Sequence, residues 1–179
     1  MSQSLTSVFA VLDRNADRVP LPVLVDWLGG LDLTADDLEK YLVFRPERYV
    51  RNLLHTGPAY QALVLCWRSG HRSPIHNHRG SNCGVRVLRG VATETTFARA
   101  PNGLIYPVAS RDLTAGHICA SADDDIHQVS NLQGGGADLI TLHIYSPPLL
   151  RMEMFSLDNP SVSDWDDPIN DPFVAGGGI

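Results

Sequence analysis

The chain has 179 residues, of which 44% are hydrophobic and 19% are charged, and its 14 Lys+Arg and 20 Asp+Glu give a formal net charge of -6. The composition excludes a disordered chain and the length is that of one ordinary domain, so we expect a single domain over residues 1–179. The basic residues are scattered, which argues against a nucleic-acid or anionic-membrane surface and favours a small-molecule site.

The pattern of apolar residues and cysteines bears on where the protein works. The longest apolar runs, 62–67 and 139–142, are far shorter than the roughly 20 residues of a membrane helix, so we expect no membrane partner. No basic segment precedes the first apolar run, which argues against a secretory signal. Cys66, Cys83 and Cys119 form no CxxC pair and argue against a disulfide scaffold. We therefore expect a cytoplasmic protein, and we expect a monomer.

The first 45 residues show helical periodicity. Two groups of apolar residues recur at spacings of three and four: Leu5, Val8, Phe9 and Leu12, and then Leu21, Leu24, Trp27 and Leu28. The run Thr34-Ala35-Asp36-Asp37 is typical of an N-cap with acidic residues in the first turn, and predicts a third helix that ends near Tyr41. Residues 1–45 are therefore predicted to be a helical N-terminal part.

From residue 49 onward, short β-rich runs are separated by clusters of Gly, Pro, Asn and Asp. We predict strands at 49–54, 61–67, 85–88, 92–97, 104–108, 126–130, 138–145 and 152–155. This spacing indicates a mainly β fold, a sandwich or small barrel over 49–156 with the helices at one end. Residues 157–179, with Pro160, Pro168, Pro172 and three consecutive glycines, are predicted to be an irregular tail with a loose end.

The most informative stretch contains His76 and His78. Two histidines at i and i+2 in an extended segment point to the same side, and imidazole is a ligand that suits Zn, Cu, Fe and Ni. By itself this pair is equally compatible with a chance occurrence on the surface. The longer spacing, from Gly70 through the histidines and Cys83 to Gly90, resembles the first cupin motif, although many cupins have a metal-binding Glu where this chain has Cys83.

A second stretch resembles the second cupin motif. Gly116 lies eleven residues before His127 and Asn131 lies four after it, whereas the usual Pro and inner Gly are replaced by Ala122 and Asp124. Together the two motifs predict three imidazoles from facing strands of a cupin-type jelly roll. Three neutral ligands leave an iron ion without a protein anion, so a substrate thiolate is a natural further donor. A Zn site with three histidines and a water is the competing interpretation.

From about residue 49 to residue 148 the chain resembles cysteine dioxygenase, a thiol dioxygenase family of the cupin superfamily. The motifs that carry the resemblance are Tyr49-Val-Arg51-Asn-Leu, Leu65-Cys-Trp67, Gly70 to His78, Val87-Leu-Arg-Gly90, Glu94-Thr and Leu142-His143-Ile-Tyr145-Ser-Pro-Pro148. The resemblance implies that His76, His78 and His127 hold Fe(II). It also implies oxidation of the L-cysteine thiol to the sulfinate, with insertion of both atoms of O2.

The resemblance also assigns roles around the metal. It implies that Arg51 pairs with the substrate carboxylate, for which a guanidinium fork has suitable geometry, and that Tyr49 helps. Taken alone, Arg51 is interpreted as a solvated charge and Tyr49 as a tyrosine at the core edge. The resemblance makes Tyr145 the active-site phenol and His143, on the same strand face, the residue that orients it.

Cys83 is the remaining residue with an implied role. Animal members of the family join a cysteine at this position to the tyrosine through a thioether, so a Cys83–Tyr145 crosslink is possible here; the alternative is an unmodified buried thiol. The family also suggests a cis Ser146–Pro147 bond, and we expect Trp67 to pack in the core near the site. We assign surface or structural roles to His55 and His117, and a surface or outer role to His71.

Two other functions stay open at this point. A related dioxygenase acting on 3-mercaptopropionate keeps the three histidines, but the Tyr-x-Arg-Asn context of Arg51 favours cysteine. A non-catalytic cupin that binds Zn or a small ligand has no need for Arg51, His143 and Tyr145.

Overall fold

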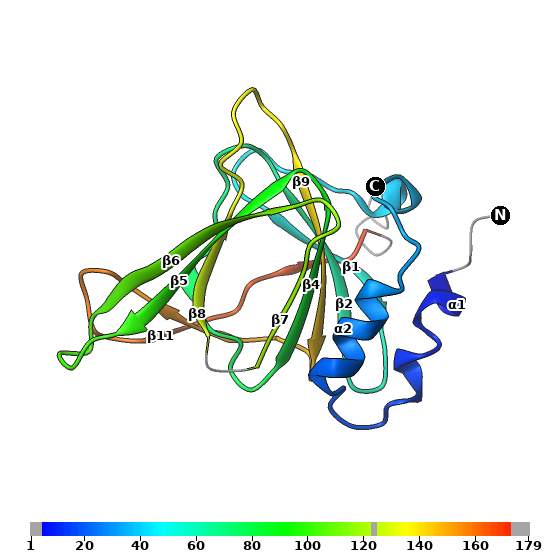
Figure 1. The fold of residues 1–179 in the computed structure, drawn as a ribbon, viewed down its shortest axis with the longest axis horizontal. Coiled ribbons are helices and arrows are strands. Elements are labelled where there is room, and N and C mark those ends of the chain that lie inside the picture. The colour runs from blue at the N-terminus through cyan, green and yellow to red at the C-terminus, as the bar shows by residue number, and fades with distance from the viewer. Residues whose placement is uncertain (1–4, 123–124, 173–179) are drawn as a thin grey trace, which may run out of the picture.

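The structure is a computed structural model that describes residues 5–122 and 125–172 (Figure 1). Its helices are α1 (Leu5–Phe9), the 3-10 turn η1 (Leu12–Arg14), α2 (Leu21–Gly29) and the 3-10 helix η2 (Asp36–Tyr41). The predicted third helix is thus a 3-10 helix, a form that short helical segments often take. None of the helices among the described residues has the length and apolar content needed to cross a membrane.

Two six-stranded sheets form the body of the molecule. Sheet A has the order β12-β1-β2-β9-β4-β7 and sheet B the order β11-β10-β3-β8-β5-β6. The strands are β1 (Val50–Thr56), β2 (Gln61–Trp67), β3 (Ile75–His76), β4 (Asn82–Arg89), β5 (Val91–Arg99), β6 (Ile105–Thr114), β7 (Ile118–Ser121), β8 (Ile126–Ser130), β9 (Leu139–Ser146), β10 (Met152–Phe155), β11 (Ser163–Trp165) and β12 (Ile169–Asn170). In the described part of the chain, all strand pairings are antiparallel except the short β1–β12 pair. The mainly β prediction is confirmed.

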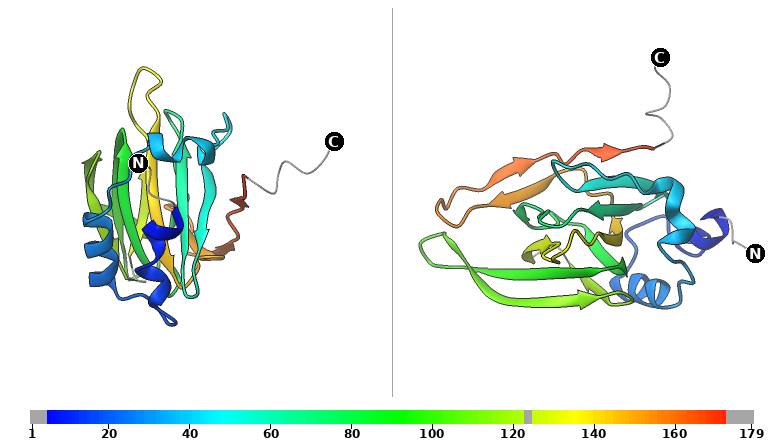
Figure 2. Two further views of the ribbon diagram at one scale, coloured as in Figure 1. Left: turned by 90° about the vertical axis from the view of Figure 1, so that its right-hand side faces the viewer. Right: turned by 90° about the horizontal axis from the view of Figure 1, so that it is seen from above.

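The predicted irregular tail is wrong in one respect, because β11 and β12 lie within residues 157–172. The segment leaves sheet B after pairing with β10 and joins sheet A beside β1, and it can be followed in orange to red in Figure 2. These strands have three and two residues and are not fully buried, so no alternation of apolar and polar residues announces them. The short strands β3 and β7 escape prediction for the same reason. The predicted loose end at 176–178 lies outside the described residues, as does Asp124.

The central strands of sheet A have a buried environment on both faces. On β9, Ile140, Leu142 and Ile144 belong to the core that includes Leu24 and Leu28 of α2, while Leu139 and Tyr145 belong to the core between the two sheets. The helices cover the outer face of sheet A, away from β5, β6 and β11 (Figure 1). Because successive side chains of a strand alternate in direction, β9 presents Thr141, His143 and Tyr145 to the barrel interior.

Close packing of α2 on β4 depends on Gly84. A Cβ at this position would lie 2.9 Å from Cδ1 of Leu28 and 3.3 Å from Cβ of Leu24. The neighbouring residue Cys83 faces the barrel interior, since it belongs to the core between the sheets. Gly84 therefore allows α2 to pack closely on one face of β4, while Cys83 faces the barrel interior from the other.

Candidate metal centre and substrate pocket

Three histidines of sheet B and its flanking loop come together inside the barrel. His76 is the last residue of β3, His78 follows in the next loop, and His127 lies on β8 directly opposite His76. Their available nitrogen atoms all lie within 4.8 Å of one another. The sequence predicts facing strands for these residues, but β3 and β8 are neighbours in one sheet. Antiparallel register brings His76 and His127 side by side.

Each of the three imidazoles uses its Nδ1 atom for a contact within the protein. His76 Nδ1 lies 3.0 Å from the carbonyl oxygen of Pro74, His78 Nδ1 lies 3.3 Å from Ser121 Oγ, and His127 Nδ1 lies 3.0 Å from Glu94 Oε1. This leaves the Nε2 atoms for a ligand. His127 Nε2 is buried and has no hydrogen-bond partner in the described part of the chain. Since a buried polar atom without a partner is costly, this orphaned nitrogen fits a metal site.

Burial keeps two of these imidazoles neutral. It lowers the pKa of His76 to about 3, with a further contribution from His127, and it lowers the pKa of His78 well below its usual value. Metal ions bind the neutral form of imidazole. The donors are therefore ready for a metal at neutral pH without first losing a proton.

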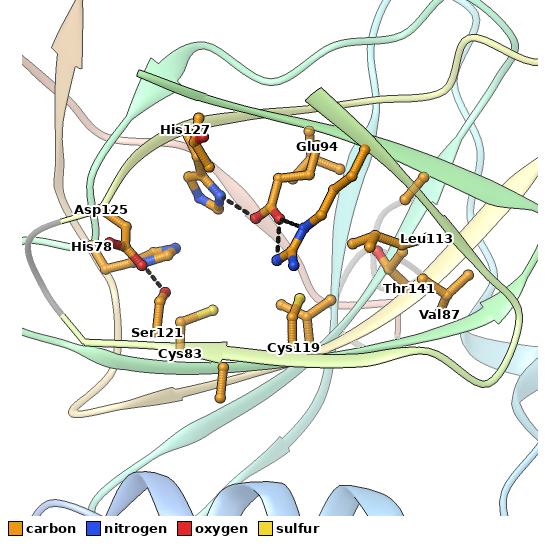
Figure 3. Close-up of a pocket in the computed structure, with 16 residues that line it drawn as sticks. His78, Cys83, Val87, Glu94, Leu113, Cys119, Ser121, Asp125, His127 and Thr141 are labelled. Atoms are coloured by element: carbon orange, nitrogen blue, oxygen red, sulfur yellow. Dashed lines mark hydrogen bonds and ion pairs between the residues drawn. The ribbon is translucent and has the colours of Figure 1, made fainter. Parts of the chain in front are cut away.

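A carboxylate relay connects His127 to the protein surface (Figure 3). Glu94 on β5 accepts from His127 Nδ1 through Oε1, and its Oε2 accepts from Arg111 Nε at 2.9 Å and Nη2 at 2.7 Å. The hydrogen bond from His127 is the main reason that the pKa of Glu94 falls to about 2. An ionised Glu94 favours the tautomer of His127 that carries its proton on Nδ1. The lone pair of Nε2 is then free to bind a metal ion.

We expect Glu94→Gln to lower metal affinity about 10- to 100-fold, the usual cost of losing a partner that orients a ligating histidine. The amide keeps the size of the side chain but loses the charge that favours the required tautomer. Titration of the metal-free variant with Fe(II) under anaerobic conditions measures the change. Thr93→Val, on the same strand but hydrogen-bonded on the surface to Asp112, is the matched control. Equal affinities of Glu94→Gln and wild type would contradict the orienting role.

The relay forms one wall of a cavity of about 110 Å³ behind the histidines. Figure 3 shows His78 and His127 at one end, Cys83 and Cys119 along one side, and Leu113 and Val87 at the other end. Burial raises the pKa of the Cys119 thiol to about 12 and that of Cys83 well above its usual value. Both thiols are therefore protonated at neutral pH.

A second, much smaller cavity of about 20 Å³ lies where the histidines face sheet A. The lining residues from sheet A include Arg51 on β1 together with His143 and Tyr145 on β9, and Tyr49 just before β1. The guanidinium of Arg51 lies 5.6 Å from the ring centroid of Tyr145. Arg51 is 2% exposed, so its interpretation as a solvated charge is wrong. The three histidines thus line one pocket with Tyr49, Arg51, His143 and Tyr145, whereas Cys83 lines the larger cavity.

Tyr145 is held by a hydrogen-bonded row along β9. His143 Nδ1 lies 2.9 Å from Tyr145 Oη, and His143 Nε2 lies 2.9 Å from Thr141 Oγ1, which also accepts from Trp67 Nε1. The sequence did not single out Thr141, although its place two residues before His143 on the same strand face was a usable signal. Trp67 is buried and stacks on Tyr49 with ring centroids 4.2 Å apart.

The row has a consistent proton arrangement. Because Trp67 donates to Thr141 Oγ1, the threonine hydroxyl can donate to His143 Nε2, and Nδ1–H of His143 can donate to Tyr145. Burial lowers the pKa of His143 to about 3, with Arg51 contributing, and burial raises the pKa of the Tyr145 phenol. A neutral imidazole therefore meets a protonated phenol, whose own hydrogen can point into the pocket.

The depressed pKa of His143 predicts acid sensitivity of the metal-free fold. In the unfolded chain histidine takes up a proton near pH 6.5, whereas folded His143 resists protonation until about pH 3. Protonation of His143 in the unfolded chain therefore lowers the free energy of unfolding as the pH falls from about 6.5 to about 3, and has no such effect above this range. When they unfold at acidic pH, the His143→Gln variant is expected to bind about one proton fewer than the wild-type protein. Urea unfolding of both proteins across the window measures this, and parallel acid profiles would refute it.

Cys83 lies directly opposite Tyr145 in the β4–β9 register. It is buried, and its side chain is in hydrogen-bond contact with the tyrosine. The Ser146–Pro147 peptide bond that follows β9 is cis, as the family resemblance suggests. The other predicted histidines stay outside the site: His55 contacts Asp13, His71 contacts the Pro46 carbonyl, and His117 is exposed.

One pocket residue has no counterpart among the sequence-based predictions. Asp167, between β11 and β12, lines the small cavity and is 6% exposed. Its Oδ2 accepts a hydrogen bond from the Tyr49 hydroxyl, and its backbone oxygen accepts from Arg51 Nη1 at 2.8 Å. The only signal in the sequence was an acidic residue in a tail otherwise predicted to be irregular, which does not distinguish Asp167 from Asp164 or Asp166.

Comparisons with known proteins agree with this geometry. Bovine cysteine dioxygenase type 1 is 36% identical over 114 residues, which cover 60% of this chain and 56% of that protein. The zebrafish (Danio rerio) protein of the same name is 32% identical over 145 residues, covering 78% of this chain and 72% of that protein. The match thus spans only a little more than half the length of the bovine relative.

Similarity to solved structures bears on the fold alone. An uncharacterised protein with a double-stranded β-helix domain from Klebsiella pneumoniae superposes with a TM-score of 0.51 at 16% identity, covering 62% of this chain and 81% of that one.

The family model described as cysteine dioxygenase type I matches residues 24–158, which include the three histidines, Arg51 and Tyr145 but not Asp167. This chain therefore belongs to the cysteine dioxygenase type I family.

Proposed function

We propose that this protein is an iron-dependent dioxygenase that converts L-cysteine and O2 to cysteine sulfinate. The observation that carries the proposal is the convergence of three buried imidazoles on a pocket that also contains Arg51 and Tyr145, in a chain of this family. Three neutral histidines suit Fe(II) and leave coordination positions for substrates. As further parts of the proposal, residues 1–179 form one cytoplasmic, monomeric domain.

In this mechanism His76, His78 and His127 hold the iron, which supplies the O2 chemistry when it is bound. Arg51 and Tyr49 bind the substrate carboxylate, and a bidentate guanidinium–carboxylate pair fixes its orientation. Tyr145 directs its hydroxyl at the bound substrate, and His143 holds that hydroxyl in place. The buried pocket excludes bulk water, so these contacts act in a low-dielectric environment.

The test combines metal analysis of the purified protein with two substrate assays. We expect iron-dependent O2 consumption and sulfinate formation with L-cysteine, with a lower kcat/KM for 3-mercaptopropionate, which lacks the amine. A markedly higher kcat/KM with 3-mercaptopropionate would assign the protein to that substrate instead. Stoichiometric Zn together with no turnover after loading with Fe(II) would favour the non-catalytic cupin.

We propose in addition that Cys83 and Tyr145 form a thioether during turnover. Opposed side chains on antiparallel strands have Cβ atoms about 4.5–5.5 Å apart, so the bond from Cys83 Sγ to the tyrosine ring needs little backbone movement. Forming it removes two hydrogen atoms, which O2 accepts. Protein incubated with L-cysteine and O2 should contain a species lighter by two hydrogens in intact-mass spectra. Cys119→Ser should keep this species and Cys83→Ser should lose it; persistence in Cys83→Ser would contradict the assignment.

A further inference from the structure

The chain from β11 to β12 (Ser163–Asn170), which we call the strap, lies across the edge of the substrate pocket. It pairs with β10 of sheet B at one end and with β1 of sheet A at the other. Asp164 and Asp166 are exposed on the strap and pair with surface arginines, whereas Asp167 is buried and lines the pocket. The strap therefore delivers one carboxylate to the interior.

Asp167 occupies the donors that the proposed function assigns to the substrate carboxylate. The Tyr49 hydroxyl donates to Asp167 Oδ2, and Arg51 Nε lies 3.9 Å from the same oxygen. Arg51 Nη1 donates to the Asp167 carbonyl oxygen at 2.8 Å, and Nη2 donates to the Leu149 carbonyl oxygen at 3.1 Å. Burial and the nearby Asp167 charge raise the pKa of Tyr49 well above its usual value, which keeps its hydroxyl a donor. The recognition groups are thus already satisfied by the chain itself.

The pocket in this state is too small for an amino acid. Its volume of about 20 Å³ is sufficient for about one water molecule. Binding of a substrate therefore requires part of the wall to move. The strap is held by short ladders, two residue pairs with β1 and three with β10, and its residues 163–166 are exposed, whereas β1 and β9 are longer strands within sheet A. Segments with few backbone pairs and exposed side chains open at the lowest free energy.

We propose that the strap is an internal competitor of the substrate: Asp167 occupies the carboxylate-binding position of the empty site, and the carboxylate of an incoming α-amino-acid thiol displaces it. This inference rests on the proposed function for the identity of the ligand. Release of the strap opens the pocket and frees the Tyr49 hydroxyl and Arg51 Nη1 in the same movement. The strap therefore makes the site selective for thiols that carry a carboxylate, because a thiol without one cannot replace Asp167 as the acceptor of these hydrogen bonds.

The first test is kinetic. If the closed strap outweighs the open form about tenfold, the apparent affinity for substrate is reduced by about the same factor. We expect Asp167→Asn to lower the KM for L-cysteine about tenfold, with a smaller effect on kcat. Asp158→Asn, which removes an equal exposed charge outside the strap, is the control and should keep the wild-type KM. A raised KM in Asp167→Asn would overturn the proposal, because Asp167 would then support substrate binding.

The second test is independent of turnover. Hydrogen exchange of residues 163–170 is measured in iron-loaded protein without ligand, with L-cysteine in the absence of O2, and with 2-aminoethanethiol, which lacks the carboxylate. We expect faster exchange with L-cysteine only, and faster exchange of ligand-free Asp167→Asn than of ligand-free wild type. Slower or unchanged exchange with L-cysteine would refute the competitor role.

The two tests separate the strap from the proposed function. If the protein consumes O2 with L-cysteine but hydrogen exchange of the strap does not change, the dioxygenase assignment holds and the strap mechanism is refuted. A strap that opens with L-cysteine in an iron-loaded protein that forms no sulfinate supports the competitor role and refutes the dioxygenase.

Discussion

Substitution of His127 by alanine is expected to abolish iron binding and to reduce activity about 10³-fold or more, since loss of a partner that merely orients a ligand already costs about 10- to 100-fold. His127 Nε2 is a buried nitrogen that lacks a hydrogen-bond partner among the described residues, and it belongs to the group of three imidazoles. Two remaining histidines hold a divalent ion far more weakly than three. Iron content after dialysis, measured alongside sulfinate formation, gives the result.

The exposed residue His117 provides the matched control for this substitution. It lies outside the site, so His117→Ala should retain wild-type iron content and activity. Thermal unfolding of the metal-free variants separates loss of a ligand from loss of the fold. A folded His127→Ala protein with full iron occupancy would remove His127 from the proposed ligand set.

The second large effect is expected at Arg51. Arg51→Ala should raise the KM for L-cysteine about 100-fold while iron stays bound, because hydrogen bonds to a charged group contribute about 1.5–3 kcal/mol. The side chain is almost completely buried and has no role in the three-histidine group, so metal content and substrate affinity should separate. Steady-state O2 consumption at varied L-cysteine measures KM, and the iron content of the same preparations is the internal reference.

Arg51→Lys tests whether geometry matters beyond charge. Lysine keeps the positive charge but lacks the planar fork, so we expect a KM between those of wild type and Arg51→Ala. Arg45→Ala removes an exposed positive charge shortly before β1 and serves as the control. Unchanged L-cysteine kinetics in Arg51→Ala would show that the carboxylate is bound elsewhere.

Several parts of the site were predictable because they are encoded locally. The alternation along 139–146 is enough to assign His143 and Tyr145 to one face of a strand, and both residues do line the pocket. The spacing of His76, His78 and His127 within two cupin-like motifs predicts a common site, and their nitrogens do converge. In each case a short repeat or a motif carries the information.

Other parts depend on contacts between distant segments. Glu94 orients His127 only because β5 pairs with β8, and Arg111 reaches Glu94 only because β6 pairs with β5. Thr141 gains its role from the indole of Trp67 on a neighbouring strand. The local sequence does not show which partner each of these residues meets, because that partner lies on another strand.

The mainly β class and the three histidines follow from the sequence alone, since strand periodicity and motif spacing are properties of neighbouring residues. The pairing of Arg51 with a carboxylate is an expectation that only the family resemblance implies. Only the tertiary structure decided that the histidines lie on adjacent strands of one sheet and that the tail contains strands. It also brought Asp167 to Tyr49 across 118 residues. The reason is physical: the register of a short, half-exposed strand is set by the partner it meets in the folded chain, and its own residues carry too little apolar pattern to specify it.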